Sequence, residues 1–226
     1  MCGRFTQSQT AEMIAEVFQV AEVPPLTPRY NIAPTQSVST VLQTPEHSER
    51  QFRQLHWGLI PSWAKDPKMG AKMINARAET VAEKPAFRSA FKQRRCLVLA
   101  DGFYEWKRLE RKKQPYYFRL DDGKPFAFAG LWEHWEGPEG EAIASCTLLT
   151  TAPNDLLRSV HDRMPVILHP QDYDLWLDPE VKAPDVLQPL LQPYPTEAMT
   201  GYPVSTLVNN PASDRPECVS PQEAVE

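Results

Sequence analysis

Residues 95–107 read RCLVLADGFYEWK, which is two short runs of apolar and aromatic residues separated by Asp101 and Gly102. Runs of this length, rich in Val, Leu, Phe, Tyr and Trp, are typical of strands. Moving outward in both directions, we expect further strands at 38–42, 54–59, 116–120, 125–132, 143–150 and 165–168. Because strands outnumber helices and the connections are short, the sequence favours a mainly antiparallel α+β domain over repeated βαβ units.

Helices and turns fill the spaces between these runs. Helical patterns occur near 10–19, 84–92, 153–160, 171–177 and 185–192, and Ser8 and Thr10 are candidate caps for the first. Two hairpin turns are predicted, at 121–123 and 136–140. The tail 209–226 begins Asn-Asn-Pro-Ala-Ser-Asp-Arg-Pro, and its composition predicts disorder.

The composition argues against several classes of protein. No apolar run approaches the ~20 residues of a membrane span, and the N-terminus lacks the apolar stretch of a signal peptide. The 4 cysteines are far apart and no Cys/His cluster occurs, so neither a metal site nor a disulfide framework is expected. We therefore expect a cytoplasmic protein that needs no cofactor.

The charge is distributed unevenly along the chain. The net charge of −5 argues weakly against nucleic-acid binding, but residues 1–130 carry 20 Lys and Arg against 13 Asp and Glu, whereas residues 131–226 carry 4 against 16. Such asymmetry allows one basic face on an acidic protein. Charge alone also fits an ordinary solvated surface with chance clustering.

Cys2 has the most distinctive chemistry in the chain. A small residue after Met1 is expected to allow removal of the methionine, which leaves a cysteine with a free α-amine. That amine has a pKa of about 7.7–8.0, so a useful fraction is nucleophilic at neutral pH. A 1,2-aminothiol reacts with an aldehyde: the amine forms a Schiff base, and the thiol then closes a thiazolidine ring intramolecularly. A cysteine can also stand at position 2 without any chemical role.

Other polar residues suit such chemistry. Arg4 can bind a phosphate or carboxylate. Glu105 stands among the aromatic residues of 101–107, and an apolar environment raises a carboxyl pKa toward general acid/base use. His161 is followed by Asp162, which puts a carboxylate beside an imidazole. Taken singly, each residue fits a core ion pair or a satisfied surface histidine better than a catalytic role.

Several motifs occur together in one order. They are Met-Cys-Gly-Arg-Phe at 1–5, Arg-Tyr-Asn-Ile-Ala-Pro at 29–34, His-Trp-Gly-Leu-Ile-Pro at 56–61, Ile-Asn-Ala-Arg-Ala-Glu-Thr at 74–80, Asp-Gly-Phe-Tyr-Glu-Trp-Lys at 101–107 and His-Asp-Arg-Met-Pro at 161–165. This set closely resembles the SRAP family (SOS-response-associated peptidases), which are abasic-site processing proteins. The resemblance implies a single α+β SRAP domain over 2–208, with coiled, mainly antiparallel sheets in a distorted barrel, flanking helices and a basic DNA channel.

The resemblance also assigns a catalytic set. Cys2 would be the nucleophile that crosslinks to an abasic site through a thiazolidine. Asn75 would orient the N-terminal residue and the opened sugar. Glu105 would act as acid and base in Schiff-base formation and reversal, and His161 would move a proton at the sugar oxygen.

A DNA-binding set follows in the same way. Arg4 and Arg77 would bind the phosphates that flank the lesion, with Thr150 as a neutral helper. Trp106 and Pro34 would wedge against bases, as aromatic groups commonly do on single strands. Trp63 is an additional candidate. The expected partner is single-stranded DNA with abasic sites, including single-strand/duplex junctions, bound by a monomer that associates with the nucleoid.

The peptidase name fits removal of Met1, either by autocatalysis or by a methionine aminopeptidase, rather than general proteolysis. A Schiff base on the deoxyribose also permits β-elimination, so weak lyase activity is an expected side path. Two other readings stay open. Glutamine amidotransferases of the N-terminal-cysteine type also begin Met-Cys-Gly, but continue with apolar residues where this chain has Arg4. A non-enzymatic nucleic-acid-binding module would leave Cys2, Glu105 and His161 unexplained.

Overall fold

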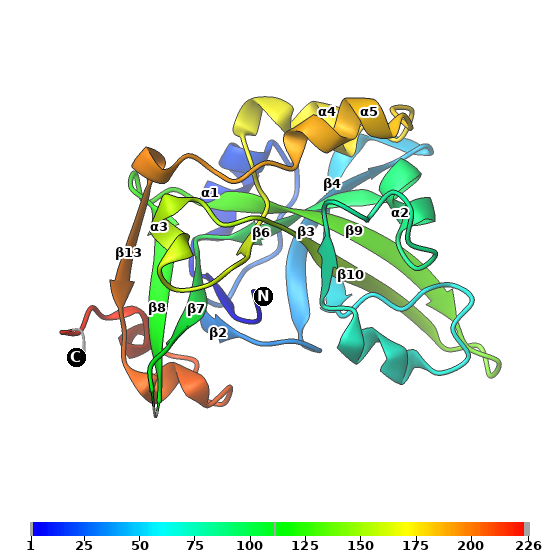
Figure 1. Cartoon of the computed structure of the whole chain (residues 1–226). Helices are drawn as coiled ribbons and strands as arrows, with labels where there is room; N and C mark the ends of the chain where they lie inside the picture. The colour runs from blue at the N-terminus through cyan, green and yellow to red at the C-terminus, as the bar shows by residue number, and fades with distance from the viewer. Residues whose placement is uncertain (1, 111, 224–226) are drawn as a thin grey trace.

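The computed structural model describes residues 2–110 and 112–223, which form a barrel with a second sheet beside it (Figure 1). Within these residues, five strands pair in a closed ring: β3 (Ser37–Thr44), β4 (His47–Trp57), β6 (Arg95–Ala100), β9 (Phe126–Glu136) and β10 (Ala142–Thr151). The pairs β3–β4, β3–β6, β6–β9 and β9–β10 are antiparallel, and a parallel β4–β10 pair closes the ring. The expected α+β fold with mainly antiparallel, barrel-like sheets is confirmed.

Three short strands extend the barrel. β5 (Asn75–Arg77) runs parallel to β10, β11 (Met164–Pro165) pairs antiparallel with the end of β10, and β12 (Ile167–Leu168) pairs with β9. The segments 74–80 and 161–165 therefore meet at the C-terminal end of β10, although the 80 residues 81–160 separate them in the sequence.

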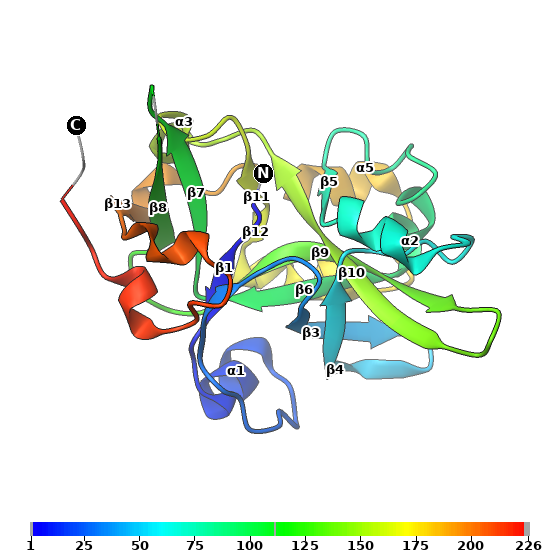
Figure 2. The same cartoon turned by 90° about the horizontal axis from the view of Figure 1, so that it is seen from below.

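The second sheet has the strand order β13-β8-β7-β1-β2, and all its pairs are antiparallel. Its strands are β1 (Phe5–Gln7), β2 (Arg29–Ile32), β7 (Gly102–Arg108), β8 (Lys113–Leu120) and β13 (Met199–Pro203). Because β7 follows β6 directly, the stretch 95–107 runs from the barrel into the second sheet (Figure 2).

The joint between β6 and β7 is tightly packed. The Asp101 carboxylate accepts hydrogen bonds from the Thr6 hydroxyl and, at 2.6 Å each, from the backbone N–H and hydroxyl of Ser8. A Cβ on Gly102 would lie 2.0 Å from the hydroxyl oxygen of Tyr117, so no larger residue fits there without a shift of the surroundings. The joint thus fixes β1, and with it the start of the chain, against β7.

An aromatic cluster fills the space between the two sheets. Phe5 packs edge-on against Trp57 and Phe128, with ring centroids 5.1 and 5.6 Å apart. Phe103 stacks on Phe118 at 5.5 Å and also contacts Phe128. Burying one side chain of this size stabilises the fold by about 1.5–3 kcal/mol. The N-terminal strand is therefore anchored by its own core residue, Phe5, three positions after Cys2.

The helices are short and flank the sheets. They are α1 (Ala11–Phe18), α2 (Arg88–Gln93), α3 (Asp155–Arg158), α4 (Tyr173–Leu177) and α5 (Pro184–Leu187), with 3-10 turns at 67–72, 170–172, 188–190, 196–198, 206–209 and 216–219. Thr10 caps α1 by accepting from the Met13 N–H, whereas Ser8 binds Asp101 instead. Trp176 of α4 packs on the barrel and donates from Nε1 to the Cys96 carbonyl. None of the helices in the described residues is long and apolar enough to cross a membrane.

The structure confirms most of the predicted elements and corrects one turn. The 136–140 turn joins β9 to β10 as a hairpin. The 121–123 turn exists, with Gly123 at φ +69°, but it links β8 to β9, which lie in different sheets, so the predicted hairpin there is wrong. Four short strands were not predicted, namely β1, β2, β5 and β13, because 3 to 5 residues carry too little periodicity to identify a strand.

The C-terminal segment also differs from its prediction. Residues 209–223 are described and pack on the second sheet, whereas disorder was expected for 209–226; residues 224–226 lie outside the described part. Cys218 is completely buried in a cluster with Tyr104 and Tyr117. The prediction of disorder from polar composition failed because Asp214 accepts hydrogen bonds from the backbone N–H groups of Tyr30 and Asn31 in β2. The sequence around Asp214 does not reveal these long-range contacts.

Candidate functional site

Cys2 lies in the interior, three residues before β1, with an exposed fraction of 0 %. Its carbonyl accepts a hydrogen bond of 2.8 Å from the Asn75 side-chain amide, and its Sγ lies 3.8 Å from the Arg4 carbonyl. Burial raises the pKa of the Cys2 thiol well above its usual range, with the nearby Glu105 carboxylate adding to the effect. The thiol therefore rests protonated and needs a base before it can attack.

Asn75 reaches Cys2 because β5 runs parallel to β10 and begins at this residue. While its Nδ2 donates to Cys2, its Oδ1 is buried and accepts no hydrogen bond within the described residues. A buried acceptor costs free energy unless it is satisfied. The carbonyl oxygen of Asn75 is therefore suited to accept a hydrogen bond from a bound hydroxyl or amine.

Glu105 projects from β7 and is 2 % exposed. Burial, the largest influence, raises the pKa of its carboxyl group to about 7. A carboxyl group that titrates near neutral pH can both give and take a proton under physiological conditions, which is what general acid/base work requires.

His161 follows α3 and brings its Nε2 to 3.8 Å from a carboxylate oxygen of Glu105. Its Nδ1 accepts a 3.0 Å hydrogen bond from the Arg163 backbone N–H, so in the neutral ring the proton belongs on Nε2, facing Glu105. Burial lowers the pKa of His161, which favours this neutral form. On protonation, Nδ1 can instead pair with the Asp162 carboxylate 3.1 Å away. The pair can thus pass a proton between imidazole and carboxylate.

Arg163 stabilises the position of His161 through its side-chain contacts. Its guanidinium binds both carboxylate oxygens of Glu79 at 2.6 and 2.9 Å and donates to the Thr150 carbonyl at 2.6 Å. The contacts tie the β11 segment to β5 and β10, the strands that carry Asn75 and Thr150. Both Arg163 and Glu79 stand inside motifs quoted above, but nothing in their residue types alone revealed the ion pair.

The candidate DNA contacts do not all reach the surface. Thr150 is 1 % exposed, and its hydroxyl lies 3.4 Å from the Ala76 carbonyl, so it braces β5 rather than facing solvent. Arg77 is exposed at the end of β5, and Trp63 is 57 % exposed. Pro34 is half-buried in the turn between β2 and β3, followed by Thr35 in the left-handed conformation at φ +68°.

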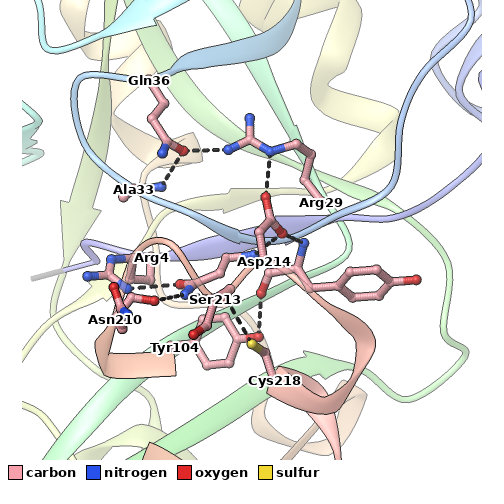
Figure 3. A network of polar contacts seen from close by, with 11 residues as sticks. Arg4, Arg29, Ala33, Gln36, Tyr104, Asn210, Ser213, Asp214 and Cys218 are labelled. Carbon is pink, nitrogen blue, oxygen red and sulfur yellow. Dashed lines mark hydrogen bonds and ion pairs between the residues drawn. The ribbon is translucent and has the colours of Figure 1, made fainter. Parts of the chain in front are cut away.

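Arg4 and Trp106 both contact the C-terminal segment. Arg4, labelled in Figure 3, donates from Nη1 to the Asn31 side chain at 2.9 Å. The same Nη1 donates to the Val208 carbonyl at 2.6 Å. Trp106, half-buried at the end of β7, donates from Nε1 to the Asn209 side-chain oxygen at 2.7 Å. Asn31 and Asn209 were not predicted as site residues, since the first lies in a Pro-rich stretch and the second in the expected tail.

Two cavities adjoin the Cys2 cluster, which consists of Cys2, Asn75, Glu105 and His161. One, of about 440 Å³, is lined by Trp63, Asn75, Arg77 and Lys84. The other, of about 400 Å³, is lined by Trp106, Lys107, Arg108, His161 and one carboxylate, that of Asp162. Each cavity thus contains one member of the cluster, an aromatic side chain and at least one cation. Aromatic platforms combined with cations are what a single-stranded nucleic acid requires.

Comparison with known proteins decides the family. A sequence model of the SOS response associated peptidase (SRAP) family matches residues 1–211. The chain belongs to the SRAP family. It is 48 % identical over 223 residues to the abasic site processing protein YoqW of Bacillus subtilis, covering 97 % of this chain and 99 % of that protein. It is 39 % identical to the abasic site processing protein HMCES of Xenopus tropicalis, covering 85 % of this chain and 66 % of that one.

Solved structures agree with the SRAP assignment. The crystal structure of a Bacteroides thetaiotaomicron protein superposes with a TM-score of 0.88 at 26 % identity, covering 98 % of this chain and all of the other. A Bordetella bronchiseptica protein of 28 % identity superposes with a TM-score of 0.75, covering 90 % of this chain. Membership of the SRAP family leaves no support for the glutamine amidotransferase alternative.

Proposed function

We propose that this chain processes abasic sites in DNA by forming a covalent thiazolidine with the opened sugar through the α-amine and thiol of Cys2. SRAP membership and the relatives named abasic site processing proteins support the general role. The observation that carries the chemistry is the convergence of Asn75, Glu105 and His161 on Cys2 from distant parts of the sequence.

The reaction balances without a cofactor. After removal of Met1, the α-amine of Cys2 adds to the aldehyde carbon of the ring-opened abasic site. The resulting hydroxyl leaves as water and gives a Schiff base. The thiol then adds to the same carbon, while its proton is transferred and the former imine nitrogen becomes an amine. The net change is aminothiol plus aldehyde to thiazolidine plus one water.

Each of the three neighbours has a distinct role. Glu105, with its pKa near 7, donates the proton on which water leaves and accepts the proton of the thiol as the ring closes. His161, with its proton on Nε2, serves the sugar oxygen as the furanose ring opens or re-forms. Asn75 holds the Cys2 carbonyl, so the two nucleophiles stay in one orientation.

The preferred substrate in this proposal is single-stranded DNA, or its junction with a duplex. The cavities beside Asn75 and His161, each with an aromatic side chain and at least one cation, support a strand that passes the cluster on both sides. We propose that Arg77 and Arg4 bind phosphates and that Trp106 and Trp63 stack on bases, with Pro34 as a wedge. Thr150 would act indirectly by bracing β5, since it is buried. Weak strand cleavage by β-elimination is the expected side reaction.

Intact-mass measurement tests the proposal directly. Incubation with a single-stranded oligonucleotide that contains one abasic site should give a species with the mass of the protein without Met1, plus the oligonucleotide, minus one water. An undamaged oligonucleotide of the same sequence is the control and should give no adduct. Cys2→Ala should form an adduct only when borohydride traps the Schiff base. A heat-stable Cys2→Ala adduct without borohydride, or an adduct that retains Met1, would overturn the mechanism.

A further inference from the structure

The C-terminal residues 206–219, here called the docked segment, are bound to β2 through a network of polar contacts. Asp214 accepts hydrogen bonds from Arg29 Nε at 2.8 Å and from the Asn31 backbone N–H at 3.0 Å, and it also accepts from the Tyr30 backbone N–H (Figure 3). One carboxylate therefore satisfies three donors of the β2 strand. This is more than a surface ion pair, because two of the donors are backbone groups.

The buried side chain of Asn31 also holds the docked segment on β2. It is fully buried, and its side-chain amide lies 3.2, 3.0 and 2.8 Å from the carbonyls of Val208, Asn210 and Ser213. These contacts fix the backbone of the docked segment around a single side chain. Val208 and Cys218 add completely buried apolar anchors against Tyr104.

From this fixed backbone, the docked segment reaches two candidate DNA contacts. The Val208 carbonyl receives the Arg4 guanidinium at 2.6 Å, and the Asn31 oxygen holds the same Nη1 at 2.9 Å. Asn209 Oδ1 accepts the indole N–H of Trp106 at 2.7 Å. An indole has a single donor, so this bond selects one orientation of the ring on the exposed side of β7.

We infer that Asn209 is a positioning residue for DNA binding: its side chain fixes the Trp106 indole as a base platform, while the carbonyls of Val208 and Asn209 hold the Arg4 guanidinium, which the proposed function assigns to phosphate binding. The inference rests on the proposed function, because it takes Trp106 and Arg4 to be DNA contacts. Orienting these side chains before DNA arrives lowers the conformational entropy that binding would otherwise cost. The docked segment is thereby part of the DNA-binding face.

A double-mutant cycle tests the link between Asn209 and Trp106. Asn209→Ala should weaken binding to undamaged single-stranded DNA about 2- to 10-fold, the range of one hydrogen bond. In a Trp106→Phe background, which keeps a ring but has no N–H, the same substitution should have no effect. The rate of crosslinking at saturating abasic DNA should stay unchanged, because Cys2 and Glu105 are untouched. An equal loss in both backgrounds, or no loss in either, would overturn the inference.

The attachment of the docked segment is tested by Asp214→Ala, with Glu217→Ala as a control of equal charge change in the same segment. Glu217 is exposed and pairs with Arg215. Asp214→Ala should weaken DNA binding relative to the control and reduce the salt slope by roughly 0.7, the contribution of one phosphate contact on a single strand. Equal affinities and slopes for the two variants would contradict the role of the docked segment.

The two levels of the proposal fail in different ways. If the unaltered chain neither binds single strands nor forms the adduct, the proposed function fails. If the unaltered chain binds and crosslinks but the Asn209 and Asp214 variants match it, only the positioning role fails. Circular dichroism of each variant should match the unaltered chain, so that a loss of affinity is assigned to the site and not to unfolding.

Discussion

At the scale of single residues, the buried carboxyl group of Glu105 links activity to stability. Its pKa is raised to about 7 by burial, so the folded state binds a proton more tightly than the unfolded chain does. The stabilisation is fully present below the unfolded pKa of about 4.3 and is lost as pH rises through 7. Glu105→Gln should therefore gain stability relative to the unaltered protein between pH 5 and pH 8, by up to about 3 kcal/mol.

Urea denaturation of both proteins at pH 5 and pH 8 measures this difference. The same Glu105→Gln substitution should slow crosslinking about 10²- to 10⁴-fold, as expected when a general acid/base is lost. A variant that crosslinks at the normal rate would remove Glu105 from the reaction, and a pH-independent stability difference would show that its carboxyl group titrates normally.

The orientation of His161 depends on the hydrogen bond that its Nδ1 accepts from the Arg163 backbone N–H. The side chain of Arg163 holds that backbone in place through its contacts with Glu79 and Thr150. Arg163→Lys keeps a cation but cannot form the two-pronged contact with Glu79. The expected result is slower sugar opening and adduct reversal, with a pH dependence shifted from that of the unaltered protein, while binding to undamaged DNA changes little. His161→Ala should show the same slow reversal and keep only the pH dependence that Glu105 contributes. Reversal kinetics between pH 6 and pH 8 make the comparison, and a normal profile for Arg163→Lys would contradict the bracing role.

At the scale of elements, the joint at Gly102 determines whether the N-terminal strand can dock. A Cβ there would clash with the Tyr117 ring and hydroxyl, the nearest atom being 2.0 Å away. Gly102→Ala should destabilise the protein by about 1–3 kcal/mol, the usual cost of overpacking. Gly140→Ala, where a Cβ meets nothing within 4 Å but φ is +88°, is the control and should cost about 1 kcal/mol from backbone strain alone. Thermal denaturation compares the stabilities of the two variants. Equal losses of stability would show that the Tyr117 side chain moves away from the added Cβ at little cost.

The elements also show which features a sequence can predict. The barrel strands β6, β9 and β10 and the 136–140 hairpin were predicted because 6 to 11 residues of apolar pattern and a Gly-rich turn are local signals. Only the end of β4 was predicted, at 54–57, because its residues 47–53 are polar apart from Phe52. The strands β1 and β5 were not predicted, although they carry Cys2 and Asn75 to the site, because their stability comes from pairing with β7 and β10 rather than from their own residues. The site residues were identified from motifs, whereas the Arg163–Glu79 and Trp106–Asn209 contacts required the fold.

At the scale of the whole molecule, a net charge of −5 coexists with cations gathered around the Cys2 cluster. If these cations bind phosphates, affinity for undamaged single strands should fall as salt rises, with no strong preference for sequence. Arg77→Ala should weaken binding to all sequences alike and reduce the salt slope by roughly 0.7. Titrations between 50 and 200 mM salt, about the range over which such contacts show their effect, make the measurement. A salt-independent affinity would exclude a phosphate-binding channel.

The complete burial of Cys2 has a consequence for the order of events during synthesis. The residue is covered only when β1 has paired with β7 and Asn75 has reached its carbonyl, so at least residues 1–108 must have left the ribosome first. Until then the N-terminus is an extended, accessible chain end. An external aminopeptidase that must reach the bond before Cys2 therefore acts most readily before the nascent chain folds and buries Cys2, whereas a self-catalysed release would act after folding has brought Asn75 and Glu105 to Cys2. A pulse-labelled chain should accordingly lose its initiator methionine in two kinetic phases if both routes operate, and in one early phase if the aminopeptidase acts alone.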